Sequence, residues 1–134
     1  VGGKTRVKSI VETCTIDTTT SGTFNFDFVD QSVVYFTQNM AANRTVNFRD
    51  SSSSTLDSVL AVGESITAAL LITQGATPYY LNTYQVDGSA VTPEWQGGTA
   101  PSAGNANSID IYSFTIIKTA SATFKCLASQ TQYA

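Results

Sequence analysis

Apolar and polar side chains alternate along most of this chain, and this period of two constrains the fold more than any other feature of the sequence. In residues 24–28 three phenylalanines share one side, with Asn25 and Asp27 between them. Residues 109–118 repeat the pattern with Tyr112 and Phe114. Successive side chains of a strand point to opposite faces, so alternation is typical of a half-buried β-strand. We therefore expect strands and no long helix.

The expected strands follow one another at short, regular intervals, with turn-forming residues between them. They cover residues 5–16, 24–28, 31–38, 43–49, 63–73, 79–86, 90–95, 109–118 and 123–129, with one short helical turn at 56–60. Asp87-Gly88 is the dipeptide most typical of a tight hairpin turn. This spacing predicts an all-β fold: a two-sheet, jelly-roll-like β-sandwich of eight or nine strands.

A single domain accounts for residues 1–134, since the mass of 14.2 kDa is ordinary for one domain and no internal repeat or linker is visible. Residues 1–22 are expected to hold the first strand and a Thr-rich turn, and residues 94–134 a long loop of small residues followed by a hairpin. The sequence begins with Val rather than Met, which suggests processing or a fragment, and its first residues have no apolar signal-peptide core.

The charge of the chain argues against nucleic acid as a partner, and the length of its apolar runs argues against a membrane. Charged residues make up only 13% of the sequence, about half the usual share. A net charge of −3 does not suit nucleic acid, which is bound through clustered Lys and Arg. No apolar run is long enough to span a bilayer, so we expect no membrane insertion.

The search for chemistry yields little, because the chain has no histidine. That absence removes the commonest general base and the commonest metal ligand. The remaining enzymatic possibility is a pair of carboxylates such as Glu94 and Asp110. For Asp110 we favour a structural role, in which it caps backbone amides of the preceding loop at the rim of its strand. We predict no enzyme, no cofactor and no metal; Asp27 and Asp30 fall short of a calcium motif.

Two cysteines, Cys14 and Cys126, lie near opposite ends of the chain. A disulfide would join them if the first and last strands were paired. Free cysteine is common in protein cores, and the sequence carries no sign of secretion, so we expect two free thiols.

Aromatic and amide side chains on a weakly charged surface favour contacts with proteins or glycans. The candidate contact residues are Tyr79, Tyr80, Trp95, Gln96, Asn105, Asn107, Arg44 and Arg49. Trp95 beside Glu94 resembles a sugar-stacking site, but a lone Trp in a small β-domain usually belongs to the core. We favour a Trp95 that closes the sandwich and a Glu94 that faces solvent.

Residues 94–119, from Glu-Trp-Gln-Gly-Gly to Thr-Ile-Ile-Lys-Thr, resemble a domain of tailed-bacteriophage virion proteins. The likeness is to the tail-fibre-like or capsid-decoration type found in phages of marine bacteria and cyanobacteria. Residues 43–49, 71–75 and 128–133 are similar to other parts of that domain, so the resemblance covers most of the chain from Thr23 onward. It implies a place on the virion and supplies no catalytic residues.

We therefore expect a non-enzymatic structural protein of a phage particle, either a capsid decoration (cement) protein or a fibre component. Its partners would be other copies of itself, in a closed oligomer such as a trimer, and other virion proteins. The alternative is a tail-fibre tip domain that binds host-surface polysaccharide through Tyr and Trp95.

Overall fold

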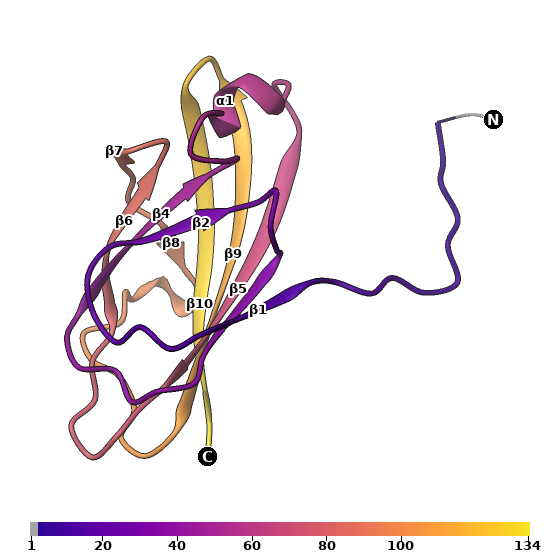
Figure 1. The fold of residues 1–134 in the computed structure, drawn as a ribbon. Coiled ribbons are helices and arrows are strands. Elements are labelled where there is room, and N and C mark those ends of the chain that lie inside the picture. Colours follow the sequence, from indigo (N-terminus) through magenta and orange to yellow (C-terminus); the bar gives the residue numbers. More distant parts are fainter. Residues whose placement is uncertain (1–2) are drawn as a thin grey trace.

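The structure is a computed structural model that describes residues 3–134, and it consists of two β-sheets packed face to face (Figure 1). The six-stranded sheet runs in the order β1 (Cys14–Asp17), β3 (Val33–Phe36), β5 (Ser65–Thr73), β9 (Ile109–Ala120), β10 (Thr123–Tyr133) and β8 (Glu94–Trp95). The four-stranded sheet runs β2 (Phe24–Asp27), β4 (Arg44–Arg49), β6 (Leu81–Val86) and β7 (Ser89–Ala90). The predicted all-β, sandwich-like architecture is confirmed, with ten strands in the described residues.

The first six strands alternate between the two sheets, so each strand pairs with the one two elements further along the chain. In one sheet β1 pairs with β3 and β3 with β5, all parallel. In the other, β2 pairs with β4 and β4 with β6, again parallel. The jelly-roll topology that we expected is not confirmed, because a jelly roll is built from Greek keys whose neighbouring strands run antiparallel.

Of the remaining strands, β7 joins the smaller sheet, and β8, β9 and β10 complete the larger one. β9 lies antiparallel to β5 and then turns back into β10, which makes the predicted C-terminal hairpin longer than its alternation indicated. The predicted hairpin at Asp87-Gly88 is also present between β6 and β7, with φ angles of 51° and 78°. Both residues of such a tight turn need positive φ, which Asp tolerates and Gly adopts freely.

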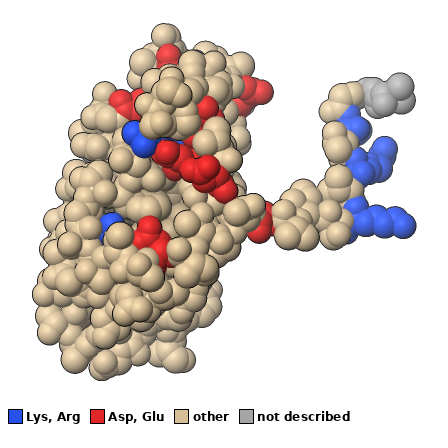
Figure 2. Space-filling model, viewed as in Figure 1, with Lys and Arg blue, Asp and Glu red and all other residues tan. Residues whose placement is uncertain are grey.

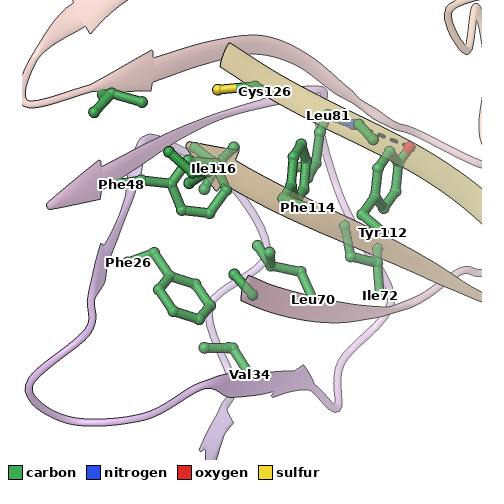
Figure 3. Packing of buried hydrophobic residues seen from close by; sticks show 14 of the residues in the cluster. Phe26, Val34, Phe48, Leu70, Ile72, Leu81, Tyr112, Phe114, Ile116 and Cys126 are labelled. Carbon is green, nitrogen blue, oxygen red and sulfur yellow. Dashed lines mark hydrogen bonds between the residues drawn. The ribbon is translucent and has the colours of Figure 1, made fainter. Parts of the chain in front are cut away.

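The core lies between the sheets and is built from the predicted apolar stripes. Phe26 and Phe48 from the smaller sheet meet Leu70 and Phe114 from the larger one, as Figure 3 shows. The ring centroids of Phe48 and Phe114 are 4.9 Å apart. Each such side chain contributes about 1.5–3 kcal/mol by leaving water, so these contacts between the sheets hold the sandwich together.

Two short helices lie outside the sheets. α1 (Leu56–Val59) is the predicted helical turn; the Thr55 hydroxyl accepts a hydrogen bond from the Ser58 N–H and so caps it. The other is a single 3₁₀ turn, η1 (Gln96–Gly98), at the start of the long loop. Within residues 3–134, the helices are too short to cross a membrane.

The first strand is much shorter than predicted, because β1 covers only Cys14–Asp17 instead of the expected 5–16. Residues 3–13 form an extended segment, here called the arm, which stands away from the body beside β1 (Figure 1). The predicted strand is therefore wrong for residues 5–13, because no strand among residues 3–134 lies beside them to pair with.

Candidate interaction surface

The outer face of the six-stranded sheet, which points away from the core, carries an apolar row across four strands. Ile16, Tyr35, Leu71 and Ile111 are partners in register on β1, β3, β5 and β9. Ile16 is 62% exposed, and the other three are half-buried. The row is contiguous because in-register neighbours on adjacent strands are close enough for their side chains to touch.

Charge is nearly absent from this outer face. The two charged side chains that the six strands place there are Lys125 and Glu94, and they form an ion pair with each other at the β8 edge. Small and hydroxyl side chains such as Ala69, Ser113 and Thr115 fill the positions around the apolar row. The centres of protein–protein interfaces are depleted in charge in the same way.

Trp95 borders a shallow hollow of about 260 Å³, on the face of β8 opposite to Glu94. Its indole packs edge-on against Tyr84, with 5.4 Å between centroids, and against Phe114 at 6.3 Å. Trp95 is therefore a half-buried residue at the end of the core, and Glu94 faces solvent, as we favoured. Burial raises the pKa of the Tyr84 phenol, whose hydroxyl donates to the Leu81 carbonyl.

Asp110 is fully buried at the base of the long loop, where three donors converge on its carboxylate. The backbone N–H of Asn105 donates to Oδ2 at 2.9 Å, its side-chain amide donates to Oδ1 at 2.7 Å, and Gln74 Nε2 donates to Oδ2 at 3.1 Å. The predicted capping role is confirmed, but Asp110 lies in the interior rather than at a rim. Glu94 lies on the outer face of an edge strand, so the two carboxylates share no cleft.

Arg44 is not a surface contact, contrary to our prediction, because only 3% of it is exposed. Its guanidinium lies 4.7 Å from the centroid of the Phe36 ring and donates to the backbone carbonyls of Gly22 and Thr19. Burial lowers the pKa of this group, and the nearby Asp17 partly offsets the effect. Arg44 thus holds the turn after β1 against the core.

Arg49 stays partly exposed and is bound to Asp27, with 2.6 Å between Nε and Oδ1. This hydrogen bond is the main reason that the pKa of Arg49 is raised. The pair joins β4 to β2 in the smaller sheet, where the two residues are register partners. Arg49 therefore already has a partner within the chain.

The other predicted contact residues differ in what they offer to a partner. Gln96 and Asn107 are exposed on the long loop. Tyr79 and Tyr80 are half-buried and pack against the core. Asn105 is held by Asp110, so its amide is not free for a partner.

The two cysteines are both free. Cys14 is exposed on β1, and Cys126 is buried on β10, four strand spacings away across the sheet. At about 4.8 Å per spacing the separation is roughly 19 Å, far beyond the reach of a disulfide. Burial raises the pKa of the Cys126 thiol to about 11.

In the part of the chain that the structure describes, no three His, Cys, Asp or Glu side chains come close enough to hold a metal ion. Comparisons with protein-family models, with curated proteins and with solved structures found no match.

Proposed function

We propose that this chain is a non-enzymatic structural protein of a bacteriophage particle, acting as a capsid decoration protein or a fibre component. The virion setting comes from the resemblance of residues 94–119 to phage virion domains. The assembly role rests on one observation, the outer face of the six-stranded sheet, which carries an apolar row and a single ion pair at its β8 edge.

The outer face supports assembly because covering it with a partner removes apolar side chains from water at little desolvation cost. Removing Ile16, which is 62% exposed, from water is favourable, and no isolated charge has to be desolvated with it. The partners on this face would be further copies of the chain and other virion proteins. No bound chemical group is needed for such a role.

The test is incorporation into particles, and it uses a matched pair of charge insertions. Ile16→Glu places a carboxylate in the apolar row, whereas Val59→Glu places one on α1, where the side chain is 48% exposed. Both positions are exposed, so both variants should fold. We expect labelled antibody on intact particles to detect the parent and Val59→Glu equally and Ile16→Glu at least about tenfold less. No label with the parent, or equal label with both variants, would refute the proposal.

A second candidate function, binding of host-surface polysaccharide, is favoured by the hollow beside Trp95. Its lining combines the aromatic rings of Tyr84 and Trp95 with the exposed polar side chains of Asn82 and Thr83. Glycan sites pair aromatic faces with hydrogen-bonding groups in this way. Asn82→Ala should weaken binding on a glycan array without disturbing the core, whereas Trp95→Ala also removes core contacts. A parent protein that binds no glycan would exclude this function.

A further inference from the structure

The arm carries apolar side chains that nothing in its own chain covers. Val7 is 60% exposed, Ile10 74% and Val11 96%. The arm leaves the body at Thr13, whose carbonyl accepts from Ser32 and Val33, and the segment before it pairs with neither sheet (Figure 1). An extended segment with unpaired backbone groups is suited to join the edge of a sheet.

The arm also carries cations that form no ion pair within residues 3–134. In an extended segment Lys4, Arg6 and Lys8 point to one side, with Val7 and Val11 on the other. The body differs, because each of its four Lys and Arg residues is either ion-paired or, like Arg44, buried. Figure 2 shows the basic side chains on the arm and acidic side chains along the face of the body. The two parts of the molecule are therefore complementary in charge.

The six-stranded sheet has a gap beside β5 of the kind that an added strand fills. β3 begins opposite Ala69, so Ser65 to Ala68 pair with β9 alone among the strands described. We call this gap the notch; it is a hollow of about 470 Å³. The Ala69 N–H donates toward β3, to the Ser32 carbonyl. Because backbone groups alternate in direction along a strand, those of Ser65 and Thr67 face the notch.

The side chains around the notch match the two sides of the arm. Phe28 and Ile66 supply an apolar wall, and Asp30, together with Glu12 from the base of the arm, supplies negative charge. Asp30 is exposed and takes part in no ion pair in residues 3–134, so it is available to a cation. Val7 and Val11 fit the wall, and Lys8 and its basic neighbours fit the acids.

We propose that the arm of one copy lies in the notch of a second copy, as a strand added alongside β5. The backbone of the arm would pair with Ser65 and Thr67, and exchange would be mutual, which gives a closed two-fold contact. The base of the arm, Glu12 and Thr13, lines the notch of its own copy, but the rest of the arm extends away from the body instead of entering it (Figure 1). This inference names a partner for the assembly role proposed above and rests on that role only for its setting.

The first test is a charge swap followed by sedimentation equilibrium of the full chain. Lys8→Glu and Asp30→Lys should each weaken self-association at least about tenfold, and the double variant should recover to within about threefold of the parent. Ser89→Lys, which adds a cation to the exposed edge strand β7 of the smaller sheet, is the control and should leave association unchanged. A parent that stays monomeric, or single variants that behave like Ser89→Lys, would overturn the proposal.

The second test separates exchange between copies from folding back within one copy. Two differently tagged proteins, both carrying Cys14→Ser, are mixed: one carries Ile10→Cys in the arm, on the side away from the apolar wall, and the other Thr67→Cys in the notch, whose side chain points to the outer face. Oxidation should give a disulfide-linked heterodimer, and Ile10→Cys mixed with Thr92→Cys should not. A chain with both new cysteines that closes only on itself would overturn exchange. If heterodimers form but the antibody described above labels no intact particles, the virion role is refuted and arm exchange still holds.

Discussion

Replacing Gly104 by alanine should test whether the long loop is held as closely against the body as the structure indicates. A Cβ at this position would lie 2.2 Å from the Tyr79 carbonyl oxygen and 2.5 Å from Gln74 Nε2. The first of these atoms belongs to the backbone, so it cannot move aside by a change of rotamer. Either the segment at Tyr79, just before β6, shifts or the loop leaves its place.

Both routes cost free energy of unfolding. Overpacking of this kind costs about 1–3 kcal/mol. Release of the loop instead removes the bonds from Asn105 to the buried Asp110 carboxylate, each worth about 1.5–3 kcal/mol as a hydrogen bond to a charged group. Replacing Gly by Ala also lowers the conformational entropy of the unfolded chain, which offsets about 0.4–1 kcal/mol of this loss of stability. We expect Gly104→Ala to lower the stability by about 2 kcal/mol, or roughly 6–10 °C in Tm for a domain of this size.

Gly75→Ala is the matched control. Its added Cβ would meet the side chain of Asn39 at 2.9 Å, and that side chain is exposed and can turn away. Urea unfolding followed by Trp95 fluorescence should therefore give a change within about 0.5 kcal/mol for Gly75→Ala. Limited proteolysis should cut the loop faster in Gly104→Ala alone. Equal effects of the two substitutions would refute the reasoning.

Three further predictions follow from buried or paired groups. Arg44→Ala should cost about 2–4 kcal/mol in urea unfolding, because it leaves a cavity beside an aromatic ring and two carbonyls without a donor. The hydrogen bond from Lys118 lowers the pKa of Asp57. The charged pair therefore stabilises the fold above about pH 4, and this stabilisation is lost as the pH falls through the folded-state pKa of Asp57. Asp57→Asn should accordingly flatten the fall of the urea midpoint between pH 5 and 2. Cys14 should react with a thiol reagent at pH 8 at once and Cys126 only on unfolding; two fast thiols would contradict the burial.

The sequence predicted the strands well and their pairing poorly, for a physical reason. Alternation in Gly63–Thr73 indicates which side of β5 is buried, and the structure confirms Leu70 and Ile72 there. It carries no information about which strand lies beside β5, because parallel and antiparallel neighbours bury the same face. The β6–β7 and β9–β10 hairpins were the exceptions, since a short turn admits only one neighbour.

The surfaces were harder to predict than the strands. Arg44 was misplaced because a flanking Arg is usually solvated, and only the fold brings aromatic rings and orphan carbonyls around it. The apolar row was missed, although Ile109 and Ile111 fall on the opposite side of β9 from Tyr112 and Phe114, and a strand apolar on both faces indicates a covered outer face. Asp110 was predicted well, because an acid next to a Gly- and Asn-rich loop has backbone donors nearby.

The winding of the first six strands between the two sheets sets the order in which the molecule can fold. Cys14 pairs with Val33, and Val33 with Ala69, so these contacts close loops of about 20–40 residues, which is slow. The β9–β10 hairpin closes a turn of a few residues and forms on a microsecond scale. We expect the hairpin to form first and to give β5 an edge on which the earlier strands then assemble, in the reverse of chain order. Pulsed hydrogen exchange should protect Phe114 and Cys126 amides before those of Val34, and the opposite order would contradict this pathway.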